Sequence, residues 1–282
     1  MTNSPKPLVS VLMTAYNRQD FIAASIQSVL DSSYTDFEFI IVDDCSTDDT
    51  FSIANEFGSK DKRIAVFKND KNMGDYPNRN IAASYAKGKY YKFVDSDDLI
   101  SSDALEIMVN AMELNSDAAF GVSIRNSTAI KYCTPSESYY CHFFEKGLLD
   151  YGPSAVIINA VHFKNEKGFK TLRNVSDNDL WLRLAAKYPM LEINDGLIFW
   201  RQHQQQQIVL YPESYLEHHL EILMDNLNSI HCPLEQKEIS SLVKKYRRLL
   251  AKSLLKFGLK SFRFKFVFLI WKKYHLNPIE LF

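Results

Sequence analysis

The sequence predicts an α/β fold in which a mostly parallel central sheet is flanked by helices. Strand-like and helix-like patterns alternate through the first hundred residues, the connections between them are short, and polar or acidic residues follow three of the strands. Such alternation implies right-handed crossovers and therefore parallel strands. With 282 residues, of which 46% are hydrophobic, the chain can bury one large core or a core with a small appendage.

Each expected element depends on its own apolar pattern. Short apolar runs predict strands, and apolar residues three and four positions apart predict helices. In chain order these are a strand at 8–13, a helix at 21–30, a strand at 37–42, a helix at 48–57, a strand at 64–67, a helix at 74–86 and a strand at 89–94. Farther along, residues 151–158 predict a turn that leads into a strand, and 180–184 begin a helix with Leu180, Trp181 and Leu184 on one face.

The fourth predicted strand ends in the sequence Asp95-Ser96-Asp97-Asp98. Three carboxylates this close repel one another, at the strand end where open α/β sheets bind their ligands. One or two carboxylates together with substrate phosphates are the usual ligands of Mg²⁺, and Mn²⁺ takes the same donors. The alternative is that these residues only cap a helix that begins near Ser101. We therefore expect a site for Mg²⁺ or Mn²⁺ here.

The first two predicted strands also end in polar residues. The first is followed by Thr14-Ala15-Tyr16-Asn17-Arg18, and the second by Asp43-Asp44-Cys45-Ser46-Thr47. Neither a Gly-x-Gly-x-x-Gly dinucleotide motif nor a Gly-Lys-Ser/Thr phosphate loop occurs. A nucleotide would then be held through a cation and polar side chains and not by glycine amides. For the second strand end, the alternative is a solvated turn that starts a helix.

Four motifs taken together resemble the family 2 glycosyltransferases of the GT-A fold, which are inverting nucleotide-diphospho-sugar transferases of the bacterial surface-polysaccharide type. The motifs lie at 10–17, at 42–50, at 72–74 with Arg79-Asn80, and at 93–98, in the family's order and spacing. The similarity is strong from residue 8 to about 125 and traceable to about 205. It implies a GT-A fold with a Rossmann-like sheet.

The resemblance implies a donor site built by the strand ends. Eight residues would contact the nucleotide sugar, namely Thr14, Ala15, Tyr16, Asn17, Asp44, Arg79, Asp95 and Ser96. Among them, Asp44 would accept a hydrogen bond from a pyrimidine ring. Asp97 would bind the Mg²⁺ or Mn²⁺ that bridges the two phosphates. His203, in an aromatic-Arg-x-His segment, would complete the metal site or contact the phosphates.

The resemblance places the catalytic base in the second half of the chain. Asp177 aligns with the family's base at the head of a helix, where Ser176 stands in place of the usual Glu. Asp179 is its rival. Residues 176–179 also form a plausible capping arrangement for the helix that follows, so the residues alone do not separate the two roles. After His203, Gln204 to Gln207 predict a loop near the donor.

Charge divides the chain into two parts. We predict a catalytic domain at 1–225, with a donor half at about 8–125 and an acceptor half at about 126–205, and a helical, basic and aromatic extension at 226–282. Residues 236–282 hold twelve Lys and Arg against two Glu, a net charge of +10 in a chain of net charge −1. Basic residues mixed with bulky apolar ones, as at 244–250 and 262–266, are typical of a helix in a membrane interface. The alternative is a helical pair packed on the catalytic domain.

The predicted function is the inverting transfer of a sugar from a nucleotide-sugar donor, with UDP as the expected nucleotide, to a hydroxyl of a glycan or lipid-linked acceptor. Without a basic start and an apolar stretch, the sequence predicts a cytoplasmic protein, with its basic end at the inner face of the cell membrane. Acidic strand ends argue against nucleic acid as a partner. Two alternatives stay open. A nucleotidyltransferase should carry a Gly-rich, basic loop after the first strand, and an inactive binding scaffold should lack a metal or base carboxylate.

Overall fold

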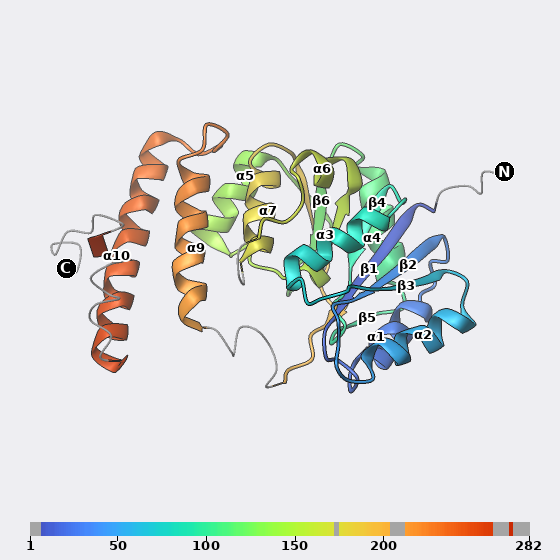
Figure 1. Cartoon of the computed structure of the whole chain (residues 1–282). Helices are drawn as coiled ribbons and strands as arrows, with labels where there is room; N and C mark the ends of the chain where they lie inside the picture. Colours follow the sequence, from blue (N-terminus) through green and yellow to red (C-terminus); the bar gives the residue numbers. More distant parts are fainter. Residues whose placement is uncertain (1–6, 172–174, 204–211, 262–270, 273–282) are drawn as a thin grey trace.

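Strands from both halves of the chain form one sheet in the computed structural model, which describes residues 7–171, 175–203, 212–261 and 271–272 (Figure 1). The expected loop at 204–207 and the aromatic-basic run at 262–266 lie outside the described residues. The sheet contains β1 (Val9–Ala15), β2 (Phe37–Asp43), β3 (Ile64–Lys68), β4 (Tyr90–Phe93), β6 (Phe120–Ser123), β7 (Lys131–Cys133), β8 (Val156–Asn159) and β9 (Met190–Ile193). Its strand order is β3-β2-β1-β4-β8-β6-β9-β7.

The sheet is mixed but mostly parallel. β1 pairs in parallel with β2 and β4, β2 with β3, and β6 with β9. β8 runs antiparallel between β4 and β6, and β7 is antiparallel to β9. The predicted parallel arrangement of the first four strands is confirmed. The antiparallel β8 has a consequence for function, because it brings the residues before its start to the edge where β4 ends.

Helices cover both faces of the sheet, as the alternation of patterns predicts. The first hundred residues supply α1 (Ile22–Leu30), α2 (Thr50–Lys60) and α3 (Asp75–Tyr85), each within three residues of its expected bounds. The later helices are α4 (Ala104–Leu114), α5 (Pro135–Tyr140), the π-helical η1 (Cys141–Glu145), the 3₁₀ turn η2 (Pro153–Ala155), α6 (Ala160–Asn165), α7 (Ser176–Ala185), α9 (Pro212–Leu227) and α10 (Gln236–Ser261).

Alternate side chains of the central strands enter two separate cores. In β1, Val11 and Met13 join a core shared with α1 and α4, whereas Leu12 faces a core shared with α3 and α7. This is the period-two alternation of a strand buried on both faces. The second core continues into the last two helices, since Leu223 of α9 and Leu242 of α10 are buried in it. Figure 1 shows α9 beside α7, with α10 outermost.

A second, two-stranded sheet was not expected from the sequence. β5 (Leu99–Ile100) follows the acidic motif directly and pairs antiparallel with β10 (Ile198–Phe199). Helix α4 therefore begins at Ala104, later than the expected start near Ser101. A two-residue strand gives too short a pattern to be read from sequence. Its pairing carries the segment after β10 to the acidic strand end.

Candidate active site

The ends of the parallel strands lie side by side at one edge of the sheet. Ala15 at the end of β1 is in register with Asp43 at the end of β2, and the next amide, Asp44 N–H, donates to Ala15 O at 2.8 Å. On the other side of β1, Leu12 is in register with Phe93 of β4. All three predicted polar strand ends therefore meet where open α/β sheets bind ligands.

The acidic motif forms a cluster at this edge. The ligand atoms of Asp95, Asp97 and Asp98 all lie within 4.8 Å of one another. Asp98 is only 5% exposed, and burial, together with the charges of Asp95 and Asp97, raises its pKa to about 7. Such mutual destabilisation is what a divalent cation would relieve. Three hard carboxylate oxygens at this separation suit Mg²⁺ or Mn²⁺.

Cationic groups surround Asp97. Its Oδ2 accepts from Arg18 Nε at 3.1 Å and lies 2.9 Å from His203 Nε2. No described residue donates a hydrogen bond to its Oδ1, which stays available to a ligand. Arg201 Nε donates to the Asp97 carbonyl, and the His203 ring stacks on Phe21 with centroids 4.5 Å apart. The pairing of β5 with β10 thus places His203 beside Asp97.

Arg79 connects the acidic motif to helix α3. This guanidinium is buried, and its Nη1 donates to Asp95 Oδ1 at 2.7 Å while its Nε donates to Asp75 Oδ1 at 2.9 Å. Arg79 is one of the residues expected to contact the nucleotide sugar. In the structure Arg79 binds the carboxylates of Asp75 and Asp95. Its contact with Asp95 holds that carboxylate in place. Charge-assisted bonds of this kind are about twice as strong as neutral ones.

Asp44, which was expected to bind the nucleotide base, holds the loop before α3. Its Oδ1 accepts from Asn69 Nδ2 at 2.7 Å and from the Met73 amide at 2.8 Å, and its Oδ2 accepts from the Gly74 amide at 2.9 Å. A carboxylate offers about four lone-pair sites. One site on Oδ2 is therefore left for a further donor. Gly74 has a φ of +90°, a conformation that favours glycine at this turn.

The loop after β1 is bound to the loop after β2. Asn17, with a φ of +51°, donates from its amide to Ser46 Oγ at 2.9 Å and accepts the Thr47 amide at 3.0 Å. Of the other residues expected to contact the nucleotide sugar, Thr14, Ala15 and Ser96 are buried, whereas Tyr16 is 44% exposed. Tyr16 is thus the member of this loop whose ring is open to a ligand.

Asp177 lies in the first turn of α7 and faces α3. Its Oδ1 accepts the Tyr76 hydroxyl at 3.0 Å and the Asn178 amide at 2.9 Å, and no described residue contacts its Oδ2. Burial raises the pKa of this carboxyl to about 6, against the opposing effect of those two hydrogen bonds. A carboxylate with one open oxygen and a raised pKa is suited to accept a proton near neutral pH.

Asp179 has a different environment, although it belongs to the same helical turn. It is 1% exposed, its Oδ1 accepts from Lys170 Nζ at 2.8 Å, and its Oδ2 accepts from Arg183 Nε at 2.7 Å. Both oxygens are engaged in ion pairs, which is a structural arrangement. Ser176 Oγ donates to Lys170 O at 2.6 Å, so this hydroxyl bonds to the preceding loop.

Sequence reasoning missed several residues of the site. Lys92 in β4 is fully buried, and its Nζ donates to the carbonyls of Phe93 and Ser154. Ser154 Oγ in turn accepts the Asp95 amide at 2.9 Å. Burial lowers the pKa of Lys92 to about 7. A lysine in an otherwise apolar strand was a visible signal, and so was Tyr76, one turn before Arg79 on α3.

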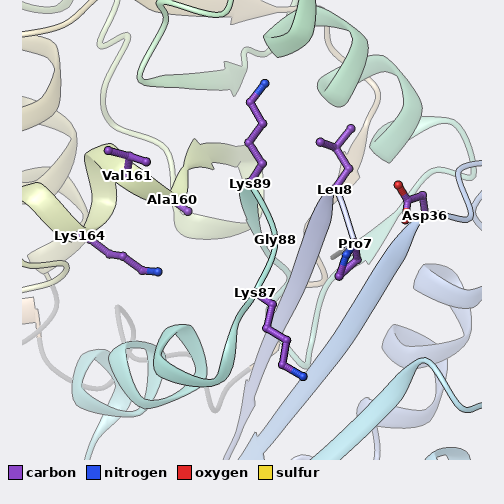
Figure 2. Close-up of a pocket in the computed structure, with 9 residues that line it drawn as sticks. All are labelled: Pro7, Leu8, Asp36, Lys87, Gly88, Lys89, Ala160, Val161 and Lys164. Atoms are coloured by element: carbon purple, nitrogen blue, oxygen red, sulfur yellow. The ribbon is translucent and has the colours of Figure 1, made fainter. Parts of the chain in front are cut away.

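A pocket of about 450 Å³ lies at the opposite ends of the strands. Figure 2 shows it between the start of β1 and the residues that precede β4, with Lys87, Lys89 and Lys164 around it. Lys89 Nζ is paired with Glu113 Oε1 at 2.6 Å. Because this pocket is at the amino ends of β1 and β4, it is separate from the acidic cluster.

Comparison with known proteins gives one family. The sequence model of "Glycosyl transferase family 2" matches residues 10–178. The uncharacterized glycosyltransferase MJ1057 of Methanocaldococcus jannaschii is 32% identical over 207 residues, which are 70% of this chain and 71% of that protein. The UDP-Glc:α-D-GlcNAc-diphosphoundecaprenol β-1,3-glucosyltransferase WfgD of Escherichia coli is 30% identical over 198 residues, 68% of this chain and 75% of WfgD.

Other similarities cover less of each chain or show the fold alone. The glycosyltransferase TuaG of Bacillus subtilis is 46% identical over 112 residues, 40% of this chain and 44% of TuaG, so the match spans less than half of that relative. S. aureus TarS 1–349 in complex with UDP-GlcNAc has a TM-score of 0.68 at 19% identity, over 84% of this chain and 71% of that one. The mannosyltransferase PcManGT of Pyrobaculum calidifontis, in complex with GDP-Man and Mn²⁺, has a TM-score of 0.67 at 16% identity, over 86% and 71%.

Proposed function

The chain belongs to glycosyl transferase family 2, and from that premise we propose that it transfers a sugar from a nucleoside-diphosphate donor to a hydroxyl of a glycan or lipid-linked saccharide. The observation that carries this proposal is the pairing of two kinds of carboxylate at one edge of the sheet. A cluster of three lies at the end of β4, and Asp177, with one open oxygen, lies across α3 from it.

The acidic cluster is the proposed donor end of the site. Asp97, through its open Oδ1, and His203 would hold Mg²⁺ or Mn²⁺, which supplies neutralisation of the negative charge that grows on the departing diphosphate. Arg79 fixes the Asp95 carboxylate, and the buried Lys92 donates to the carbonyl of Ser154, whose hydroxyl accepts the Asp95 amide. Thr14, Ala15, Tyr16, Asn17, Asp44 and Ser96 are proposed to line the nucleotide-sugar site with them.

Asp177 is the proposed base. Its Oδ2 takes the proton of the acceptor hydroxyl while that oxygen forms a bond to the anomeric carbon. The bond between this carbon and the diphosphate oxygen breaks, and its electron pair leaves with the nucleotide. Attack from the side opposite the leaving group inverts the anomeric centre. A positioned base contributes about 10²–10⁴-fold to such a step.

UDP is the proposed nucleotide of the donor. The name of WfgD specifies UDP-Glc as its donor and a diphosphoundecaprenol-linked GlcNAc as its acceptor, and TarS was solved with UDP-GlcNAc. PcManGT was solved with GDP-Man, so GDP is the comparison that a binding experiment must include. We propose an acceptor of the lipid-linked or glycan class on the same grounds.

Calorimetric titration of the purified protein tests the donor site. UDP and GDP are each titrated with and without Mn²⁺. We expect binding of UDP that depends on Mn²⁺ and disappears in Asp97→Ala. The matched control is Asp103→Ala, because this carboxylate is exposed, lies beyond β5 and contacts Ser101. Equal binding by wild type and Asp97→Ala, or no binding of either nucleotide, would contradict the proposal.

We also propose that the basic face of α10 contacts an anionic membrane. Lys244, Lys245, Arg248 and Lys252 are exposed on this helix, while Leu242 and Leu250 on the opposite side are buried. Each such cation contributes about 1 kcal/mol near an anionic surface. Among the described residues, no helix is both long and apolar enough to span a bilayer.

Sedimentation with lipid vesicles tests the membrane contact. We expect the protein to sediment with phosphatidylglycerol vesicles and not with neutral phosphatidylcholine vesicles. Reversing two charges in Lys244→Glu/Lys245→Glu should remove most of this binding. Lys60→Glu/Lys62→Glu makes the same change of net charge at exposed positions at and just beyond the end of α2, and should keep it. If both double variants bind equally, the face of α10 is not the contact.

A further inference from the structure

Three loops bring together a cation and two aromatic rings that have no part in the mechanism above. Arg125 follows β6, Tyr151 precedes η2, and Trp200 follows β10. The Arg125 amide donates to Tyr151 Oη at 3.1 Å. The rings of Tyr151 and Trp200 are 6.4 Å apart between centroids and tilted by 43°, and Arg125 Cζ lies 5.6 Å from the centre of the Trp200 ring. We call these three residues the aromatic-cation cluster.

The aromatic-cation cluster is tied to the donor side of the site. Trp200 immediately precedes Arg201, whose guanidinium binds the Asp97 carbonyl. Three residues after Tyr151, Ser154 accepts the amide of Asp95. Each aromatic residue is therefore within three positions in sequence of a residue that bonds to the acidic motif.

The cluster is also tied to the side of the proposed base. The Tyr151 carbonyl accepts Trp181 Nε1 at 2.8 Å, and Trp181 is about one helical turn beyond Asp177 on α7. The next residue of α7 after Asp177, Asn178, donates to Leu149 O at 2.9 Å. The cluster is thus anchored both to the acidic motif and to α7. An acceptor must lie between these two elements for its hydroxyl to reach the donor sugar and Asp177.

The chemistry of the cluster selects a ligand class. Arg125 is exposed, and its guanidinium lies within 4.0 Å of no described carboxylate, although its charge contributes to the lowered pKa of Asp195. The nearby Asp195 carboxylate accepts the amides of Asn126 and Gly196, both at 2.7 Å. A guanidinium presents five donors in a planar fork that matches phosphate and carboxylate. Tilted aromatic faces offer apolar surface against which the C–H face of a sugar ring packs.

We propose that the aromatic-cation cluster is an acceptor subsite for a saccharide that carries a negatively charged group, either a phosphate or a carboxylate. The sugar ring lies against Trp200 and Tyr151, and Arg125 binds the anion. This inference rests on the proposed function, because it supplies the acceptor that Asp177 deprotonates. It deepens that function, because it requires a negatively charged group on the acceptor. A neutral glycan has no such group.

Ligand-observed saturation-transfer NMR tests this subsite. The protein is first saturated with UDP and Mg²⁺, which blocks the donor site, and is then titrated with glucose 1-phosphate, glucuronate or glucose up to tens of millimolar. We expect at least one anionic sugar to receive saturation on its ring protons, and glucose to bind more weakly. Binding of glucose 1-phosphate alone would identify phosphate as the anion, and binding of glucuronate alone would identify carboxylate.

Two variants and a control separate the cluster from general charge effects. Arg125→Gln should weaken binding of the anionic sugar about tenfold, because one charge-assisted contact is lost. Trp200→Leu should remove the transfer to ring protons. The control is Arg63→Gln, since Arg63 also lies over an aromatic ring, 4.5 Å from the centre of Phe37, but away from the site. It should bind like wild type.

The outcomes distinguish this proposal from the proposed function. If UDP binds but Arg125→Gln binds the anionic sugars like wild type, or glucose binds as tightly as they do, the subsite is wrong and the donor site stands. The subsite is equally wrong if no sugar gives a response. If UDP fails to bind, the proposed function fails, and with it the acceptor role of the subsite, even where sugar binding depends on Arg125. Because Arg125 is exposed, its variant should fold even if Trp200→Leu does not.

Discussion

Two regions of the molecule carry the same short pattern, two aspartates separated by one residue, and use it in opposite ways. At the end of β4, Asp95 and Asp97 share one cluster with Asp98 and lie within 4.8 Å of each other. At the start of α7, Asp177 and Asp179 diverge. The first faces Tyr76 on α3, and the second is held by Lys170 and Arg183.

Secondary structure explains the difference. In a helix, residues two positions apart point about 200° away from each other around the axis. A carboxylate on one side of the first turn of α7 can therefore face the site while the other is buried among structural cations. Beyond a strand end the chain turns, so that residues with the same spacing can converge. The same spacing in sequence thus indicates a shared ligand in a loop and divided roles in a helix.

The largest expected effect separates the two aspartates of α7. Asp177→Asn keeps the shape of the side chain, but the amide cannot take the proton from the hydroxyl of the acceptor saccharide. We expect the turnover number to fall about 10²–10⁴-fold, since that is the contribution of a positioned base. Binding of UDP with Mn²⁺ should be unchanged, because the donor end is separate. The measurement is steady-state release of UDP beside calorimetry of UDP binding.

Asp179→Asn is the counterpart and should act on stability. Removing this buried charge takes the carboxylate partner from Lys170 and leaves Arg183 with Glu166 alone, which should lower the free energy of unfolding by about 1–3 kcal/mol. Activity per folded molecule should stay close to wild type. Urea denaturation gives the stability change. If Asp179→Asn instead abolishes turnover at unchanged stability, the roles of the two aspartates are exchanged.

The pH profile sharpens the assignment further. A base must be deprotonated to act, so activity should fall as pH drops through the Asp177 pKa of about 6. Tyr76→Phe removes a donor that favours the charged carboxylate, so this pKa should rise and the acidic limb should move to higher pH by up to about one unit. The other charged groups that act on Asp177, Asp75 and Arg79 of α3, stay in place.

The control for this pH effect is Tyr85→Phe. Tyr85 is at the end of the same helix, and its ring stacks on Phe67, away from α7. It should leave the acidic limb where it is. A Tyr76→Phe enzyme whose activity falls without any movement of the limb would show that Tyr76 acts on structure alone.

The smallest expected effect concerns Arg18. This residue pairs with Asp97 of the acidic motif that follows β4. The positive charge of this guanidinium on Oδ2 opposes the binding of a cation at Oδ1 of the same carboxylate. Arg18→Met should therefore tighten Mn²⁺ binding to the nucleotide-free protein, by no more than about fivefold for a partly exposed pair. Electron paramagnetic resonance of free Mn²⁺ measures it. Weaker Mn²⁺ binding would mean that Arg18 orients Asp97 for the metal.

Local pattern predicted the first half of the structure well. The apolar runs of β1 to β4 and the spacings of α1 to α3 each specify their own element, so their existence and order could be read directly. The acidic motif at the end of β4 was also visible, because a buried strand seldom ends in three carboxylates. The two-residue strands β5 and β10, by contrast, are too short to produce a period.

The sequence by itself determined that this is an α/β protein with polar strand ends, an acidic motif and the four motifs of its family. Tertiary structure alone decided which atoms meet. His203 reaches Asp97 over 106 positions because β10 pairs with β5, and Tyr76 reaches Asp177 over 101 positions because α3 packs beside α7. The physical reason is that periodicity reports which face of an element is buried, whereas the partner across that face depends on how distant elements pack.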